Sequence, residues 1–383
     1  MSSLLRSLLY RYDHNDSTLP ELSSIKTSLK DFTNISLTCR DDEYLELSDL
    51  DFANKFTHVL QLELCKLDVT WSEIIFILKH MPSLEVLNLS GNISLNSADY
   101  SPELYHANLK ELILNSTNIS LTFAADIVEY FPNLETLHLS SNNYDQNSTS
   151  DILLSDRPNV VVKNVYLSRN SFTSIMDILP IGQVFKAIEL MCLSECHHLS
   201  DFPETITRTQ LINSFTSSFP RLKTLFISHC PITCWYTINF IGMISSLEHL
   251  TITDIPLVAN TSQFSEDFSN EEKTQRRRYL LISNLPNVKY LNHTLISAEE
   301  RENAERFSIR YFDQVHEGNI YECPSVYRRL VEKHGQLQQL AEIEMSPQKE
   351  VIITVEYYRE YIALVFFSYG FLVLENIFTF LIF

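Results

Sequence analysis

The chain has 383 residues, of which 45% are hydrophobic and 20% charged, a composition typical of a globular protein with a large core. Its formal net charge of −19 argues against a nucleic-acid partner, because affinity for nucleic acid depends on a basic surface that releases counterions. Its six glycines form no GxGxxG or GxxxxGKS/T run, so a nucleotide-binding loop is not expected either.

Residues 1–58 are predicted to form an N-terminal flank ahead of the regular part of the chain. Their first apolar stretch is interrupted by Arg6 and Arg11, and it is too short and too charged for a signal peptide. The weakly strand-like segment 34–47 could hold an early, degenerate repeat. The seven cysteines are an odd number and do not bracket the later repeats as paired caps, so we expect a reducing compartment.

Residues 59–284 repeat one phrase, L-x-x-L-x-L-x-x-N/C, as in MPSLEVLNLSGN and FPNLETLHLSSN. The first four copies are 25 residues apart, at positions 62, 87, 112 and 137. This spacing is typical of leucine-rich repeats, whose period is about 20 to 29 residues. A looser ninth copy, LPNVKYLNH, lies beyond this range and follows a polar insertion over 260–278. The second apolar position of each copy falls at Leu62, Leu87, Leu112, Leu137, Val165, Met191, Leu225, Leu250 and Leu291.

We therefore predict an α/β leucine-rich-repeat solenoid, with a curved parallel sheet on its concave side and helices on its convex side. Strand leucines point inward by period-two alternation. Helical spacing follows the strands, with apolar residues at Trp71, Ile74, Ile75 and Leu78 and again at Ala124, Ile127, Val128 and Phe131. A residue at the end of each phrase should turn inward and satisfy backbone groups there. These residues are Asn92, Thr117, Asn142, Asn170, Cys196 and Cys230.

The concave face is the expected binding surface, because its side chains are held by the sheet without being needed to fill the core. Tyr166, Arg169 and Phe226 are the candidate anchors, since Tyr and Arg are enriched at interface hot spots. The alternative for each is that it merely covers the sheet. The candidate partner-binding residues are Glu63, Lys66, Asn88, His138, Tyr166, Arg169, Phe226, His229 and Thr251.

No catalytic, metal or cofactor site is expected. The chain has no nucleophile elbow and no HExxH motif. The segments CLSECHHL and SHCPITC gather cysteines and histidines, but Cys196 and Cys230 are predicted to face the core while Cys192 faces the concave surface. Four ligands could not converge tetrahedrally from such positions, and stacked buried thiols are the simpler interpretation.

After the repeats we predict a repeat cap over 285–312, in which Ser297 and Glu300 form a capping box ahead of a charged helix. A linker is predicted over 313–346. Residues 347–358 contain EVIITVEYY, a strand-like segment, and residues 359–383 form a hydrophobic tail.

The tail from Tyr361 to Phe383 is long enough to cross a membrane, although Glu375 and Asn376 interrupt it. Two interpretations stay open for it. It is either an alternative or mistranslated C-terminus, which cuts short the domain that 347–358 would begin, or a membrane anchor. Contact with a membrane is expected only through this segment.

Taken in order, HVLQLELCKLDVTW, MPSLEVLNLSGN, LPNVKYLN, AEERENAERFSIRYF and YRRLVEKHGQLQQLAEIEMSPQKEVIITVEY resemble the tubulin-folding cofactor E group, over about residues 55 to 356. No glycine-rich CAP-Gly module precedes the repeats, so the closer resemblance is to the cofactor E-like form without that module. The resemblance implies a ubiquitin-like domain at the C-terminus, of which 347–358 would be the first strand. Here the expected domain does not follow.

The resemblance further implies a non-catalytic protein of the cytoplasm and cytoskeleton that binds tubulin, with α-tubulin favoured, and that regulates the stability of tubulin heterodimers and microtubules. A chain at −19 should repel the acidic tubulin tail, so the contact is expected either with the folded body of tubulin or through a local basic spot such as Arg276 to Arg278. The alternative is a leucine-rich-repeat adaptor for another protein partner, either cytosolic or tethered to a membrane by the tail.

Overall fold

The computed structural model describes residues 34–38, 56–96, 104–152, 160–200, 208–259, 269–315, 325–335, 362–367 and 370–375. Within these ranges, one large sheet has its strands in chain order. Its strands are β1 (Asn34–Thr38), β2 (Gln61–Cys65), β3 (Val86–Asn88), β4 (Glu111–Ile113), β5 (Thr136–His138), β6 (Asn164–Tyr166), β7 (Leu190–Cys192), β8 (Thr224–Phe226), β9 (His249–Thr251), β10 (Tyr290–Leu291) and β11 (Thr294–Leu295).

The pairing of the strands confirms the predicted solenoid. Strands β1 to β10 are parallel neighbours, and only β11 runs antiparallel to β10. The nine apolar positions aligned from the sequence, from Leu62 to Leu291, are register partners from each strand to the next. The first strand, β1, lies inside the 1–58 flank, in the segment 34–47 where an early, degenerate repeat was considered, and it pairs Ile35 with Leu62.

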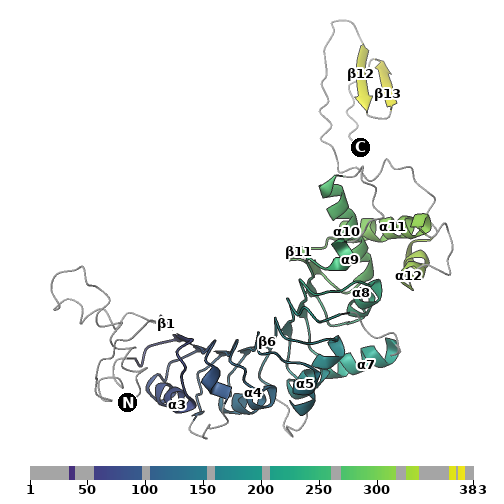
Figure 1. The fold of residues 1–383 in the computed structure, drawn as a ribbon. Coiled ribbons are helices and arrows are strands. Elements are labelled where there is room, and N and C mark those ends of the chain that lie inside the picture. The colour runs from purple at the N-terminus through teal and green to yellow at the C-terminus, as the bar shows by residue number, and fades with distance from the viewer. Residues whose placement is uncertain are drawn as a thin grey trace.

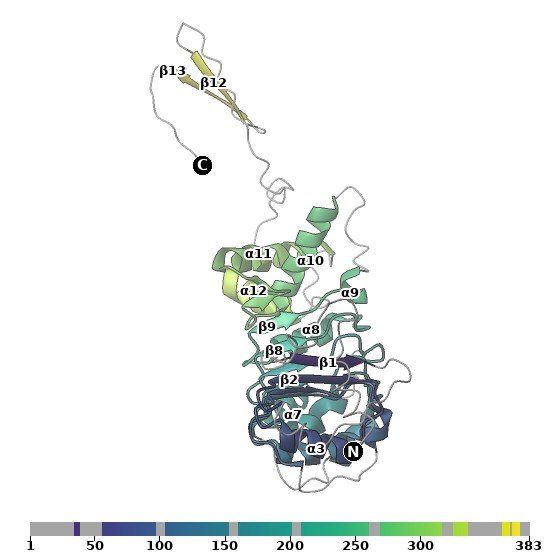
Figure 2. The ribbon, with the colours of Figure 1, turned by 90° about the vertical axis from the view of Figure 1, so that its left-hand side faces the viewer.

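Helices cover the outer side of the curved sheet, as Figure 1 shows for α3, α4, α5 and α7. Figure 2 looks from the β1 end and places the strands on one side of the array and α3 on the other. The helices before the cap are α3 (Trp71–His80), α4 (Leu121–Ile127), α5 (Gln146–Ile152), α6 (Leu179–Val184), α7 (Arg208–Ser218), α8 (Trp235–Gly242) and α9 (Pro256–Ala259). Short 3-10 helices are η2 (Ile93–Asn96), η4 (Val128–Tyr130) and η5 (Ile175–Ile178).

The predicted helical faces point into the core with one adjustment. In α3, Trp71, Ile74 and Leu78 are buried, but Ile75 is only partly buried and Ile77 takes the fully buried position beside them. In α4 and the turn after it, two repeats further on, all the predicted apolar residues are buried, and Val128 begins a tighter 3-10 turn. The core is therefore one continuous stack along the array, as expected when no repeat can bury its own apolar face.

A ladder of buried polar side chains runs along one edge of this core, as predicted. The amide oxygen of Asn92 accepts hydrogen bonds from the backbone N–H of Leu67 and Val69 of the preceding repeat, at 2.9 and 3.3 Å. Its amide nitrogen donates to the carbonyls of Leu64 and Leu89. The side chain thus satisfies backbone that has left the sheet, which would be costly to bury unpaired.

The C-terminal end of the sheet is covered by three helices, α10 (Asn270–Asn284), α11 (Ala298–Val315) and α12 (Ser325–His334). They share a second apolar cluster that includes Leu280, Phe312 and Leu330. The polar insertion over 260–278 includes the first part of α10. One expectation is corrected here, because the predicted linker over 313–346 contains α12, whose apolar face packs against α11.

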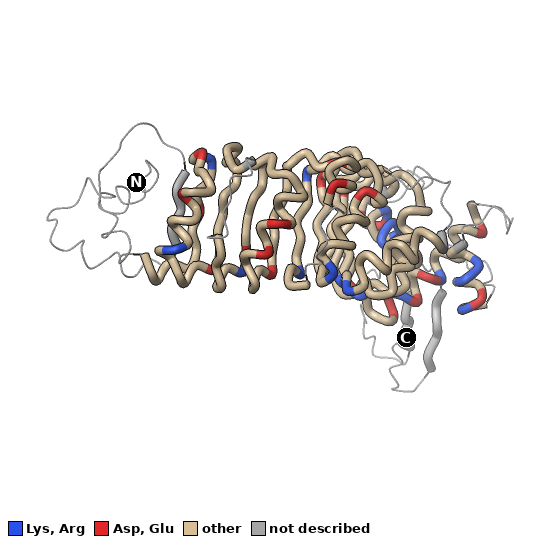
Figure 3. Tube along the Cα trace, turned by 90° about the horizontal axis from the view of Figure 1, so that it is seen from below, with Lys and Arg blue, Asp and Glu red and all other residues tan. Residues whose placement is uncertain are grey.

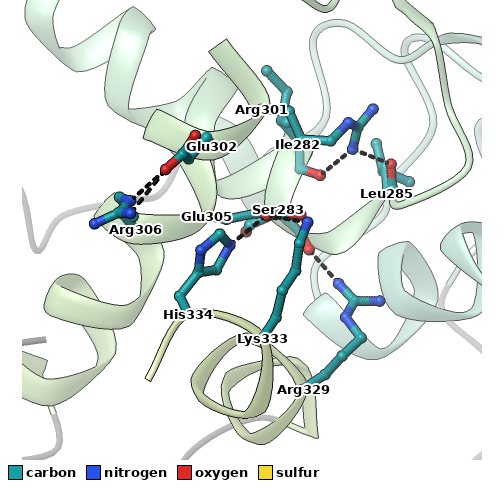
Figure 4. A network of polar contacts seen from close by, with 10 residues as sticks. All are labelled: Ile282, Ser283, Leu285, Arg301, Glu302, Glu305, Arg306, Arg329, Lys333 and His334. Atoms are coloured by element: carbon teal, nitrogen blue, oxygen red, sulfur yellow. Dashed lines mark hydrogen bonds and ion pairs between the residues drawn. The ribbon is translucent and has the colours of Figure 1, made fainter. Parts of the chain in front are cut away.

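Polar contacts tie the cap helices together, as Figure 4 shows. The guanidinium of Arg301 donates to the carbonyls of Ile282 and Leu285, and that of Arg329 donates to Ser283, so two cations occupy the C-terminal end of α10. This is the end of a helix that cations stabilise. The buried carboxylate of Glu305 is 2.7 Å from the ammonium of Lys333 and pairs with His334. Burial alone raises the pKa of Glu305, but the hydrogen bonds from Lys333 and His334 outweigh it and hold the pKa below its usual range.

The predicted capping box at Ser297 is only half formed. The Ser297 hydroxyl accepts a hydrogen bond from the backbone N–H of Glu300 at 3.0 Å. The Glu300 carboxylate, however, makes a bidentate pair with Arg278 of α10, at 2.6 and 3.1 Å. The Glu300 side chain therefore links α11 to α10 and does not cap the N-terminus of α11.

Part of the hydrophobic tail forms a separate antiparallel pair, β12 (Ile362–Phe367) and β13 (Gly370–Glu375). Among the residues that the structure describes, no helix has both the length and the apolar character needed to cross a membrane. The predicted strand over 347–358 lies outside the described residues.

A candidate protein-binding face on the concave side

The third residue of each strand from β2 to β9 forms one row on the concave face, and the structure confirms this predicted placement. Each member is the register partner of the next. Strand residues alternate between half-buried and buried, so this row faces out while the leucine between faces in. The row consists of Glu63, Asn88, Ile113, His138, Tyr166, Cys192, Phe226 and Thr251.

The first residue of each strand faces the same side, and it brings in residues that the sequence interpretation did not select. Glu111 and His249 are two of these, together with Tyr290 at the last parallel strand. The imidazole of His138 stacks on the ring of Tyr166, with centroids 4.2 Å apart and planes 1° from parallel. His249 stacks in the same way on Tyr290, at 4.5 Å and 3°.

His138 is held from a second side by Glu111, whose carboxylate lies 3.0 Å from its Nε2 atom. Burial lowers the pKa of His138, and the neighbouring Glu111 carboxylate opposes that effect. Burial also raises the pKa of Tyr166. These groups therefore form a packed platform in the middle of the face, not a set of independent side chains.

The far-side candidates Lys66, Arg169 and His229 lie at the turn that follows each strand. Their φ angles are 57°, 58° and 56°, in the left-handed region that most residues avoid. The backbone N–H of each donates to a carbonyl of the next repeat, for example Arg169 to Ser194 at 3.1 Å. These hydrogen bonds continue the ladder beyond the strands and hold the side chains in a second row.

Charges in this second row pair with one another. The guanidinium of Arg169 makes two hydrogen bonds to the Glu195 carboxylate, at 2.7 and 2.9 Å. His229 lies 3.4 Å from Asp254. The structure thus brings Tyr166 and Phe226 to the open face, whereas the predicted anchor Arg169 is engaged at its border.

The opposite border carries a row of alternating charge that sequence reasoning missed. Each residue precedes a strand, and each backbone N–H donates to the carbonyl of its counterpart one repeat earlier. The ammonium of each lysine lies 2.7 to 2.9 Å from the glutamate of the preceding repeat. In Figure 3, acidic and basic segments alternate along one edge of the array. This charged row is Glu85, Lys110, Glu135, Lys163, Glu189, Lys223, Glu248 and Lys289.

A signal for this row was present in the sequence. Every member stands two positions before the second apolar residue of its repeat, for example Glu85 before Leu87 and Lys110 before Leu112. Aligning that column together with the leucines shows an unbroken alternation of sign. In the phrase used to find the repeats this column is the first unspecified position, x, so its alternation of sign was not compared.

The cysteines lie where the repeat phrase places them. Cys196 and Cys230 are buried, and their thiols donate to the carbonyls of Leu167 and Leu193. Burial raises the pKa of Cys196 to about 12 and that of Cys230 to about 11. Cys192 faces the concave surface, 3.1 Å from the hydroxyl of Ser168. Within the described part of the chain, no three His, Cys, Asp or Glu side chains are placed to hold a metal ion.

Comparisons with known proteins confirm the resemblance noted in the sequence. A Rattus norvegicus protein named tubulin-specific chaperone cofactor E-like protein is 27% identical over 323 residues, which are 84% of this chain and 69% of that protein. The Homo sapiens protein of the same name is 28% identical, with the same shares. Tubulin-specific chaperone E of Mus musculus is 32% identical over 241 residues, 62% of this chain and 41% of its own length. No protein-family model matches the chain.

Among solved structures, an internalin from Listeria monocytogenes is similar over 80% of this chain and 79% of its own, with a TM-score of 0.37 and 14% identity. The names of the sequence relatives describe chaperone cofactors, and these comparisons indicate no catalytic family.

Proposed function

We propose that the chain is a non-catalytic tubulin-binding protein that regulates the stability of tubulin heterodimers and microtubules, and that it works through its concave face. The main support is the similarity to cofactor E-like proteins of several species over most of this chain. The matched regions cover 84% of this chain and 69% of the rat and human proteins.

The geometry of the concave face also supports the proposal. The sheet fixes Tyr166 and Phe226 on an open surface, and the backbone behind them is fully engaged in the ladder. A preorganised surface loses little conformational freedom on binding, so its contacts contribute more of their energy to affinity. Large aromatic side chains are the residue types that most often dominate such interfaces.

The proposed mechanism is a shift of an equilibrium by mass action. The face would bind one tubulin subunit, α-tubulin being favoured, in a conformation that the heterodimer or the lattice does not accept. Binding to that state alone would raise its population without any chemical step. Such a role fits a protein of the cytoplasm and cytoskeleton.

A pull-down from cytosol with the full-length chain tests this proposal, with α- and β-tubulin detected separately. The wild type should retain tubulin, and a Tyr166→Ala, Arg169→Ala, Phe226→Ala triple variant should lose it. A matched triple variant on the convex helices, Lys79→Ala, Glu129→Ala and Thr216→Ala, should retain it, because these exposed residues lie on the opposite side.

Circular dichroism of all three proteins would confirm that they are folded. If a folded wild type retains no tubulin, the proposal is wrong, and a repeat adaptor for another protein partner becomes the better hypothesis. If the convex variant loses tubulin while the concave variant keeps it, the binding face has been misplaced.

A further inference from the structure

The concave face is divided into two chemically different halves. On the N-terminal half, Glu63 and Glu111 face outward from β2 and β4. On β6 to β10, no outward position carries Asp, Glu, Lys or Arg. The larger side chains there are Tyr166, Leu190, Phe226, His249 and Tyr290, and Tyr290 is 37% exposed. An uncharged, largely aromatic surface therefore occupies one half of the face.

The charges that border this half cancel within the chain. On one side Glu189 pairs with Lys223 and Glu248 with Lys289. On the other side Arg169 pairs with Glu195. Each of these charges already has a partner at hydrogen-bond distance, so the border offers little attraction to a charged ligand. Although the chain has a net charge of −19, this half of its concave face should attract a charged partner only weakly.

A short hairpin closes the far end of this surface. Strands β10 and β11 are joined by Asn292 and His293 alone, both with positive φ, as a two-residue turn requires. The ring of His293 approaches that of Phe226, with centroids 6.2 Å apart. Beyond it, Leu295 is 61% exposed on the last strand. The hairpin thus adds the imidazole of His293 and the exposed side chain of Leu295 to the surface where the parallel sheet stops.

We infer that the surface from Tyr166 to Leu295 is the docking site, and that its occupant is an uncharged, apolar patch of a folded protein. Interface cores are depleted of charged residues and enriched in Tyr and Phe, as this surface is. The inference rests on the proposed function, in which the occupant is the folded body of tubulin. An acidic segment such as the tubulin tail is not the expected occupant, because no outward position on β6 to β10 carries Lys or Arg and the chain as a whole is negatively charged.

The test measures the Kd of the full-length chain for purified tubulin at 50, 150 and 300 mM salt, with intact tubulin and with tubulin whose acidic tails have been removed by limited proteolysis. A Phe226→Ala, Tyr290→Ala variant probes the proposed half. A Gln61→Ala, Ile113→Ala variant is its control on the other half of the same face, because Gln61 is an exposed outward residue of β2 outside the candidate set.

We expect the variant of the aromatic half to weaken binding at least about tenfold and the control variant less than about threefold, as for hot-spot and neutral interface positions. Salt should change the Kd by less than about threefold, because the proposed interface contains no ion pair between this chain and tubulin. Removal of the tails should leave the Kd unchanged.

Each other outcome has a distinct meaning. The inference is wrong, while the proposed function stands, if the wild type binds tubulin but the control variant loses more affinity than the variant of the aromatic half. The same holds if added salt or removal of the tails weakens binding more than about tenfold. If a folded wild type does not bind tubulin under any of these conditions, the proposed function itself is contradicted, and this inference falls with it.

Discussion

The backbone N–H of Asn142 donates a hydrogen bond to the side-chain oxygen of Asn170, one repeat further along, at 3.0 Å. Asn142 uses its own side-chain oxygen in the same way, for the N–H groups of Thr117 and Asn118. Asn142 therefore both supports the repeat before it and depends on the repeat after it. Such reciprocal contacts couple neighbouring repeats, as the cooperativity of a solenoid requires.

Replacing Asn142 by Ala should destabilise the protein strongly. The side chain is 6% exposed and bonds three backbone groups, which would be left buried without partners. We expect a loss of about 3 kcal/mol in the free energy of unfolding, measured in urea. Asn133→Ala is the control, because this exposed amide bonds only the Ala107 carbonyl and should cost less than about 1 kcal/mol. Equal losses in the two variants would contradict the ladder interpretation.

Reversing one charge of the charged row should destabilise the array through repulsion. Lys163→Glu would place a carboxylate between Glu135 and Glu189, whose backbones are bonded directly to residue 163. The loss should exceed that of Lys163→Ala, and it should shrink in high salt because these side chains are exposed. Unfolding curves at 50 mM and 1 M NaCl would measure both effects. A loss for Lys163→Glu that does not respond to salt would exclude repulsion as its cause.

The buried thiols should be nearly inert in the folded protein. Burial raises the pKa of Cys196 and Cys230 to about 12 and about 11, so few thiolates form near pH 8, and reagents cannot reach the sulfur. Iodoacetamide labelling followed by mass spectrometry should show Cys192 and Cys234 reacting on the order of 100-fold faster. Both buried cysteines should react freely in urea. Fast labelling of Cys196 without denaturant would show that its repeat opens readily.

His106 should make stability depend on pH below neutrality. Its Nε2 atom lies 3.0 Å from the Met81 carbonyl, and its Nδ1 atom is buried with no hydrogen-bond partner. Burial lowers the pKa of His106 from 6.5. Below pH 6.5 the unfolded state therefore binds the proton first, and the stability that neutral His106 contributes above pH 6.5 is lost as the pH falls through the folded pKa.

A His106→Gln variant tests this dependence, because groups common to both proteins cancel in the comparison. The wild type should be the more stable of the two at pH 7.5, and its advantage should narrow at pH 5.5. If the stability difference between the wild type and the variant grew on acidification, folding would raise the pKa of His106 and not lower it, which would contradict the prediction.

The repeats could be predicted from the sequence because their spacing and their chemistry agree. Leucines at fixed intervals define the register, and a buried Asn or Cys at a fixed offset has one place to go, so Asn92 and Cys230 were placed correctly without coordinates. The positions of these residues could be predicted from a single repeat, because each repeat packs between two neighbours of the same kind.

The features that were missed depend on contacts between elements that a repeat phrase does not describe. Glu300 was assigned to its own helix cap, but Arg278 of another helix is within reach and offers two donors. The stack of His138 on Tyr166 depends on the distance between strands as well as on residue type. Helix α12 was taken for a linker because its apolar face becomes evident only against the cap helices.

Because charge alternates from Glu85 to Lys289, repeats that carry an acidic residue in this row alternate with repeats that carry a basic one. Loss of the single repeat that carries Lys110 would bring Glu85 next to Glu135, and duplication of that repeat would set two lysines side by side. Loss or duplication of two adjacent repeats would leave every acidic residue beside a basic one. Changes in length of this solenoid are therefore tolerated more easily in even numbers of repeats, and a history of such paired duplications would leave a period of two repeats in the sequence.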